Sequence, residues 1–187
     1  TMPSASGTSF PKRAVSKHRP RLALSMGDPA GIGPEVVAKA ATVSGVRAAA
    51  DITIYGDPEL LNRAVRDMAI SIEVVEVDGF DHDLRDATKL PVHPVSRIAD
   101  ESFTWCTPIP ATDVAQVEYV KAAFHAVFEG PADAIVTAPI NKAALNRAGV
   151  HWPGHTEMLA ELSGGARPLM MLAGPTLRVV PLTVHVP

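Results

Sequence analysis

The chain has 187 residues, 47% of them hydrophobic and 20% charged, and 17 basic against 20 acidic side chains give it a net charge of −3. These values are typical of a globular protein, and no apolar run reaches the roughly 20 residues of a membrane-spanning helix, so we predict no membrane partner. The single cysteine, Cys106, cannot form an intrachain disulfide, which favours a reducing, cytoplasmic location.

Residues 1–20 carry four Lys/Arg side chains, no acid and scattered Ser, Pro and Gly, which predicts a disordered leader. Without these residues, the segment 21–187 holds 13 basic and 20 acidic residues and has a net charge of −7. No basic stripe of the kind that binds nucleic acid is present in the sequence, so we expect no nucleic-acid partner.

From residue 21 onward the sequence alternates predicted strands and helices. A strand over 21–26 leads through a glycine-rich turn into a helix over 34–43, a strand over 51–56 precedes a helix over 58–68, and a third strand covers 71–77. This order predicts an α/β fold with a mixed, largely parallel sheet and flanking helices.

The middle of the chain is less regular. Residues 78–112 are proline-rich and contain one strand candidate, 91–95, which predicts a surface excursion or a connection between subdomains. A helix over 113–130 then presents one apolar face, made of Val114, Val117, Val120, Ala123, Phe124 and Val127.

The last third of the chain returns to regular patterns. We predict a buried strand over 133–140, helices over 142–150 and 156–165, and a strand pair over 169–174 and 177–185. His185 stands at the end of the last strand, where α/β enzymes place ligands and metals.

Three stretches are candidates for chemistry. The first, "SMGDPAGIGPE" (25–35), joins a strand to a helix through glycines, either to bind an anion on backbone N–H groups or to relieve strain in a tight connection. It is not a dinucleotide fingerprint, because Val36 stands where the third glycine is required. Asp28 is its side chain best placed to face a substrate.

The second stretch, "VTAPINKAAL" (136–145), places Lys142 at a helix start, where its charge opposes the helix dipole. Lys142 either binds a phosphate or carboxylate or is a solvated surface lysine. In the third, "PGHTEMLAEL" (153–162), Thr156 or His155 can cap a helix. Alternatively, a neutral His155 at the helix start contacts a substrate oxygen.

Taken together, "SMGDPAGIGPEV", "DAIVTAPINKAALNRAG" and "PGHTEMLAEL" resemble the 4-hydroxythreonine-4-phosphate dehydrogenases of pyridoxal phosphate biosynthesis, in order and spacing, over residues 21–187. The resemblance implies a fold similar to isocitrate and isopropylmalate dehydrogenases, incomplete here at the C-terminus. It also implies a homodimer whose active site lies in a cleft shared between subunits.

The same resemblance implies the reaction. Family members oxidise the secondary alcohol of a phosphorylated hydroxy acid, here 4-phosphonooxy-L-threonine, with NAD or NADP, and the resulting β-keto acid loses CO2. A divalent metal (zinc, magnesium or cobalt) supports both halves of that chemistry. By resemblance, His155 and Thr156 contact substrate, His185 is the first of three metal-binding histidines, and the cofactor-binding residues are unknown.

The family's chains are nearly twice this length, so the resemblance implies that two metal histidines and most of the nucleotide site lie beyond Pro187. We therefore expect the 187 residues alone to be inactive. Three explanations for the short chain stay open: a fragment of a full enzyme, a natural short form, or an enzyme whose missing half is supplied by a second polypeptide. Two alternatives stay open: a threonate or erythronate phosphate or cis-dihydrodiol carboxylate as substrate, and a non-catalytic binding or assembly module. Asn141, where the vitamin-pathway enzymes more often carry histidine, favours the former.

Overall fold

The computed structural model describes residues 19–80, 86–99 and 104–183. Its main feature is a five-stranded sheet in the order β3-β4-β2-β1-β5. The strands are β1 (Arg21–Ser25), β2 (Asp51–Gly56), β3 (Glu73–Glu76), β4 (Lys89–Pro94) and β5 (Ala134–Thr137). All four pairings between neighbours are parallel, so the carboxyl ends of the strands meet at one edge. The predicted α/β fold with a largely parallel sheet is therefore confirmed.

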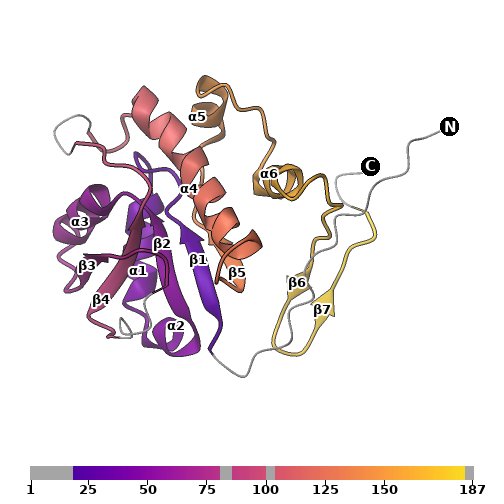
Figure 1. Cartoon of the computed structure of the whole chain (residues 1–187), viewed down its shortest axis with the longest axis horizontal. Coiled ribbons are helices and arrows are strands. Elements are labelled where there is room, and N and C mark those ends of the chain that lie inside the picture. The colour runs from indigo at the N-terminus through magenta and orange to yellow at the C-terminus, as the bar shows by residue number, and fades with distance from the viewer. Residues whose placement is uncertain (1–18, 81–85, 100–103, 184–187) are drawn as a thin grey trace.

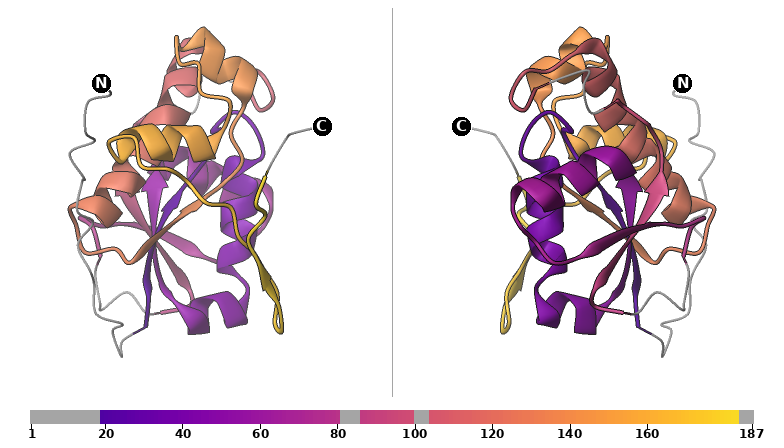
Figure 2. Two further views of the ribbon diagram at one scale, coloured as in Figure 1. Left: turned by 90° about the vertical axis from the view of Figure 1, so that its right-hand side faces the viewer. Right: turned by 90° about the vertical axis from the view of Figure 1, so that its left-hand side faces the viewer.

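Helices cover both faces of this sheet (Figure 1, Figure 2). They are α1 (Gly33–Ala41), α2 (Ser44–Ala49), α3 (Pro58–Asp67), α4 (Pro110–Phe128), α5 (Lys142–Arg147) and α6 (His155–Leu162). The alternation of β2 shows how the layers form: Ile54 joins the core cluster that contains residues of α1 and α3, whereas Tyr55 packs with Ala123 of α4. The sheet is thus the middle layer of three.

β4 lies inside the sheet, between β2 and β3. This strand belongs to the proline-rich stretch 78–112, yet Leu90 and Val92 are completely buried. The strand runs over Lys89–Pro94, so it begins two residues before the strand candidate at 91–95 and ends one residue before it. This part of the stretch contributes to the core and is not on the surface.

A buried carboxylate connects β2 to the segment after β4. Asp57 follows β2 and is fully buried, and its Oδ1 accepts hydrogen bonds from the N–H groups of Glu59 and Leu60 at the start of α3, at 3.0 and 3.2 Å. Its Oδ2 accepts from the N–H of Ile98 at 2.6 Å and from Ser96 Oγ at 2.8 Å. Four donors therefore hold the chain where it leaves β2 and β4.

Several sequence predictions about the helices need correction. α2 was not predicted, and none of its residues is buried. α4 begins at Pro110, where the Thr112 hydroxyl accepts from the N–H of Ile109 at 2.9 Å. Val114 was placed on the buried face of this helix but is 47% exposed, and the polar residues Asp113 and Gln116 are buried instead.

The end of the chain also differs from the prediction. β6 (Leu172–Ala173) and β7 (Arg178–Val179) form an antiparallel hairpin that stands apart from the main sheet (Figure 1). Residues 181–183 are outside any strand, and Leu182 is 98% exposed, so the predicted strand 177–185 is much shorter than expected. His185 and the predicted leader, apart from Arg19 and Pro20, lie outside the described residues.

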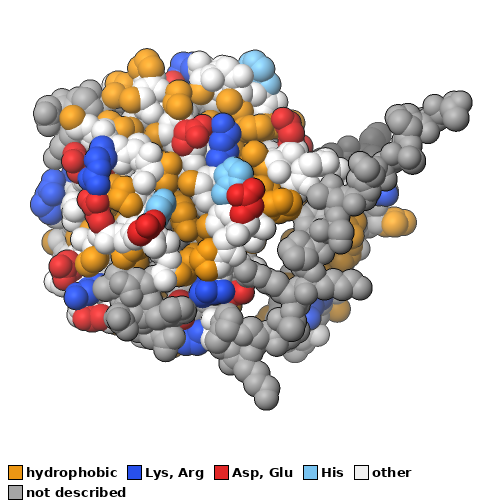
Figure 3. Space-filling view, in the orientation of Figure 1, with side chains coloured by type: hydrophobic (Ala, Val, Ile, Leu, Met, Phe, Trp, Pro, Cys, Tyr) orange, Lys and Arg blue, Asp and Glu red, His pale blue; other side chains and the backbone are white. Residues whose placement is uncertain are grey.

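In the described part of the chain, no helix is long and apolar enough to cross a membrane. Basic and acidic side chains are interspersed on the face shown in Figure 3, without a segregated basic stripe.

Candidate functional site at the carboxyl edge of the sheet

The turn after β1 is fastened to the loop after β5. The N–H of Asp28 donates to Pro139 O at 2.8 Å, and the N–H of Ala138 donates to Ser25 O at 3.1 Å. Asp28 is 7% exposed, and its Oδ1 accepts from the N–H of Ala30 at 2.9 Å. Two of the three candidate stretches therefore meet at the carboxyl edge of the sheet, where open α/β folds bind ligands.

The glycines of this turn are packed against the protein's own backbone. Gly27 has φ +76°, and a Cβ at this position would collide with Pro139 O. A Cβ at Gly33 would likewise collide with Met26 O. Because chain atoms already occupy this space, these two glycines serve the tight connection and do not leave an open cradle for a phosphate.

The loop after β5 leads into α5 through a cap that the sequence analysis did not identify. Asn141 is the N-cap, and its side-chain oxygen accepts from the N–H of Ala144 at 3.2 Å. The N–H of Asn141 itself donates to the buried Gln116 Oε1 of α4 at 2.8 Å. Lys142 is the first residue of α5 and is exposed. Its role as a ligand or as a solvated lysine stays a prediction.

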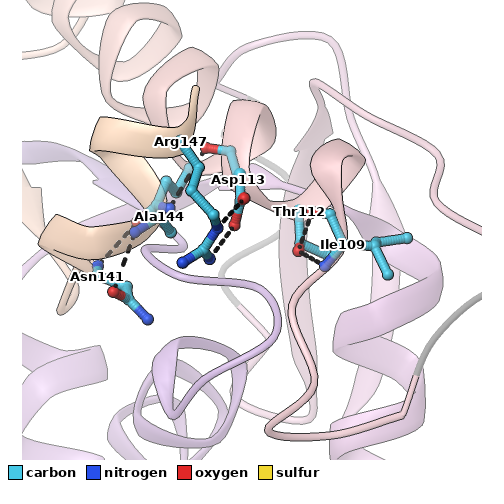
Figure 4. Close-up of polar contacts among 7 residues, drawn as sticks. Ile109, Thr112, Asp113, Asn141, Ala144 and Arg147 are labelled. Carbon is cyan, nitrogen blue, oxygen red and sulfur yellow. Dashed lines mark hydrogen bonds and ion pairs between the residues drawn. The ribbon is translucent and has the colours of Figure 1, made fainter. Parts of the chain in front are cut away.

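A bidentate ion pair joins α4 to α5 beside this loop (Figure 4). Arg147 Nε and Nη2 donate to Asp113 Oδ2 and Oδ1 at 2.7 and 2.8 Å. The Asp113 side chain is 6% exposed and that of Arg147 is 49% exposed. The hydrogen bond to Asp113, the charge of Asp113 and the charge of Asp28 raise the pKa of Arg147. The guanidinium compensates a buried carboxylate and is held in one orientation.

α6 begins at His155, and its N-cap is Gly154, with no side-chain cap. The prediction that Thr156 or His155 caps this helix is therefore wrong. Thr156 lies within the first turn and is exposed, whereas the Nε2 atom of His155 is buried and has no hydrogen-bond partner among the described residues. Burial lowers the pKa of His155, so the imidazole is neutral at neutral pH.

Apolar packing fixes α6 in place against α4 and α5. Met158 of α6, Leu145 of α5, and Val117 and Val120 of α4 form one buried cluster. Trp152, on the segment before α6, packs against it and donates from Nε1 to Glu161 Oε2 at 2.6 Å. The apolar cluster of α4, α5 and α6 therefore fixes the position of His155, the first residue of α6.

The described residues do not form a metal site. No group of three or more His, Cys, Asp or Glu side chains within the ranges 19–80, 86–99 and 104–183 could hold a metal ion. The predicted metal ligand, His185, lies outside these ranges. The side chains described at this edge do not complete a metal centre by themselves.

Four residues near this edge were not predicted from the sequence: Ser25, Asp113, Gln116 and Arg147. Ser25 ends β1 and is fully buried, and its Oγ has no hydrogen-bond partner within the described residues. A serine at the carboxyl end of a predicted parallel strand is a signal that could have found it. Asp113 and Gln116 are buried polar residues of α4, but nothing in the sequence connects them to Arg147 or Asn141.

These features define a parallel α/β domain with polar side chains gathered on the loops that follow β1 and β5. Its sequence matches the family model described as pyridoxal phosphate biosynthetic protein PdxA over residues 48–187. The chain belongs to this family, as the sequence resemblance predicted.

Individual relatives agree with this assignment. The chain is 42% identical over 177 residues to a 4-hydroxythreonine-4-phosphate dehydrogenase of Methylorubrum populi, covering 92% of this chain and 50% of that protein. It is 37% identical over 167 residues to the same enzyme of Geobacter metallireducens, covering 89% and 49%. The crystal structure of a 4-hydroxythreonine-4-phosphate dehydrogenase from Burkholderia phymatum matches with a TM-score of 0.83 and 32% identity, covering 91% of this chain and 51% of that one.

Two further matches bear other activities in their names. A putative D-threonate 4-phosphate dehydrogenase of Oceanobacillus iheyensis is 33% identical, with 90% of this chain and 51% of that protein covered. A terephthalate 1,2-cis-dihydrodiol dehydrogenase structure from Burkholderia xenovorans matches with a TM-score of 0.62 and 27% identity, covering 86% of this chain and 46% of that one. The chain thus spans about half the length of the relatives it matches.

Proposed function

We propose that the protein acts as an NAD(P)-dependent dehydrogenase of a phosphorylated hydroxy acid, with 4-phosphonooxy-L-threonine as its substrate, and that the 187 residues supply one side of the substrate site. The observation that carries this proposal is the buried Nε2 of His155, which has no partner within the described structure and lies in a stretch that resembles the family. An unpaired polar atom at such a place is ready to bond a ligand.

His155 and Thr156 take the substrate-contacting roles in this proposal. Because burial lowers the pKa of His155, its neutral imidazole offers either a hydrogen-bond donor or an acceptor to a substrate oxygen. The exposed Thr156 hydroxyl, one residue further along α6, offers a second such group. Neither side chain brings a charge, which suits the alcohol end of the substrate.

Lys142 and Asp28 supply charges on the neighbouring loops. The exposed ammonium of Lys142 attracts the phosphate or carboxylate of a hydroxy acid. Asp28 is held by its own turn and is nearly buried, so its carboxylate orients hydroxyl or ammonium groups without moving. These roles require that the substrate lie over the carboxyl ends of β1 and β5.

The nicotinamide cofactor would accept the hydride from the secondary alcohol, and decarboxylation of the β-keto acid would follow. His185 remains our candidate for one metal ligand. The described residues contain no group that could hold a metal ion by itself. We expect the isolated 187-residue chain to bind zinc or cobalt weakly, and a tight stoichiometric site in isothermal titration would contradict this.

A chimera tests the proposed function. The 187 residues are joined to the second half of the Methylorubrum populi relative, and NADH or NADPH formation is followed with 4-phosphonooxy-L-threonine. We expect turnover in the dimeric chimera and none in the 187-residue chain. H155Q should lower kcat/KM by about 100-fold, typical for a lost contact to the reacting group. H151Q is the control, because His151 is an exposed histidine four residues away that bonds Asn146.

Two other candidate functions keep specific support. The relatives named as D-threonate 4-phosphate and cis-dihydrodiol dehydrogenases favour a different substrate for the same chemistry. In the same assay, turnover of those substrates but not of the threonine phosphate would select this alternative. The second candidate is a non-catalytic binding or assembly module, which reduction of NAD by the purified 187-residue chain would exclude.

A further inference from the structure

Gln116 is a polar side chain on the buried face of α4. It is completely buried, and two residues close to it in the helix, Val117 and Val120, belong to the apolar cluster that packs α4 against α5 and α6. An apolar side chain of similar volume would fill this place without the cost of burying an amide group. Packing alone therefore does not account for an amide at this position.

Both polar atoms of the Gln116 side chain make hydrogen bonds. Oε1 accepts from the N–H of Asn141 at 2.8 Å, and Nε2 donates to Asp113 O, one turn earlier in α4, at 3.3 Å. Because the bond to Asp113 O stays within α4, it fixes the direction in which the amide group is turned. The oxygen of Gln116 is thereby directed at the backbone of the loop after β5.

α5 depends on contacts of this kind because it has only six residues, and helices this short are marginal on their own in water. Its C-terminal end is held by the ion pair between Arg147 and Asp113 (Figure 4), and its middle is held by the buried Leu145. Its N-terminal end is held by Gln116, through the N–H of Asn141. Two buried polar residues of α4 therefore bond to the two ends of α5.

The loop after β5 connects two of the proposed substrate-binding residues. Lys142 follows Asn141 directly, and Pro139 O accepts the N–H of Asp28. A shift of the backbone at Asn141 therefore moves the ammonium group of Lys142 and loosens the turn that carries Asp28. Because Gln116 is completely buried, it acts on these groups only through the backbone of the loop.

We propose that Gln116 is a positioning residue of the substrate site. Its hydrogen bond from Asn141 N–H fixes the loop after β5. Lys142 and Asp28 then hold the anionic and hydroxyl groups of the substrate in one geometry. This inference rests on the proposed function, because it takes over the substrate-binding roles of these two residues. It adds a residue that does not contact substrate and that lies outside the three candidate stretches.

Gln116→Met tests the proposal in the chimera with the second half of the Methylorubrum populi relative. Methionine has a similar volume but removes the acceptor. We expect KM for 4-phosphonooxy-L-threonine to rise about 3- to 10-fold, the equivalent of one lost hydrogen bond, with kcat changed by less than about twofold. Gln116→Glu should keep KM within about twofold of the unsubstituted chimera, because a carboxyl group offers Asn141 N–H an oxygen acceptor whether or not it is protonated.

Thr112→Val is the matched control. Thr112 is also a completely buried polar residue of α4, but its hydrogen bonds are to Ile109 at the start of the same helix. Thr112→Val and Gln116→Glu should both lower the thermal midpoint, and neither should raise KM by more than about twofold. If KM follows the thermal midpoint in all three variants, or if Gln116→Met leaves KM unchanged, the positioning role is refuted.

Phosphate binding by the 187-residue chain separates this proposal from the proposed function. In a titration with inorganic phosphate, followed by the NMR signals of the Lys142 side chain, Gln116→Met should weaken binding about 3- to 10-fold. Equal affinity, or no response of Lys142 to phosphate, would overturn the positioning role. Turnover by the chimera with a normal KM in Gln116→Met rejects that role and leaves the function intact. A folded chimera without turnover, together with weakened phosphate binding in Gln116→Met, rejects the function alone.

Discussion

Replacing Asp57 with alanine is expected to destabilise the fold more than replacing Asp86 or Arg147 with alanine. The fully buried carboxylate caps α3 and also accepts from Ile98 N–H and Ser96 Oγ. Loss of an N-cap costs about 1 kcal/mol. The buried Ile98 N–H left without an acceptor costs about 1–3 kcal/mol more. Ser96 keeps its hydrogen bond with the Tyr119 hydroxyl, at 2.6 Å, so losing its bond to Asp57 adds little to the cost in stability.

The expected loss in the free energy of unfolding for Asp57→Ala is therefore about 2–4 kcal/mol, measured by urea unfolding at pH 7 with circular dichroism. Asp86→Ala is the matched control, because Asp86 makes a similar local pair of hydrogen bonds with Thr88, at 2.8 and 2.7 Å, but is exposed. The loss in the free energy of unfolding for Asp86→Ala should be much smaller than that for Asp57→Ala.

Equal losses for Asp57→Ala and Asp86→Ala would refute the reasoning. They would mean that the hydrogen bonds from α3 and from the segment after β4 to Asp57 stabilise the fold no more than the hydrogen bonds of the exposed turn at Asp86. An unchanged denaturant midpoint for Asp57→Ala with an altered slope would also contradict it, because that result places the effect in the unfolded state.

Three further substitutions probe the candidate site. Arg147→Ala should lower the free energy of unfolding by leaving the buried Asp113 carboxylate uncompensated, and adding Asp113→Asn should recover part of that loss in a double-mutant cycle; simple additivity would contradict the pairing. Gly27→Ala should destabilise far more than Gly149→Ala in thermal unfolding, because both have φ +76° but only Gly27 has backbone where a Cβ would stand. Folding lowers the pKa of His155, so the contribution of this residue to stability is present above the ordinary pKa of 6.5 and is lost as the pH falls from 6.5 through the lower pKa of the folded state. In denaturant unfolding between pH 7.5 and 5, H155Q should flatten this decline in the free energy of unfolding. An unchanged pH profile would contradict the assignment.

The elements with strong local patterns were predictable from the sequence. The β-branched alternation of residues 51–56 and the apolar spacing of 58–68 correspond closely to β2 and α3. α2 escaped prediction because it packs with no buried side chain and so leaves no periodic signal. The place of β4 between β2 and β3 also escaped, because strand order depends on contacts between distant segments.

For the candidate site too, some features were predictable from the sequence and others were not. The stretches that contain Asp28, Lys142 and His155 were recognisable as loops at strand ends or helix starts. The burial of His155 Nε2 and the bond between Asp28 N–H and Pro139 O required coordinates. Asp113 and Arg147 are 34 residues apart in the sequence, and no local sequence pattern predicts their ion pair.

The sequence by itself determined the family, the alternation of strands and helices, and the three motifs, because these depend on local patterns and on residue identity. Only the tertiary structure decided which glycines pack against backbone atoms and which polar groups of the described residues are buried without a partner. These properties arise when segments far apart in the chain are brought together, because burial belongs to the packed assembly of elements and not to any one of them.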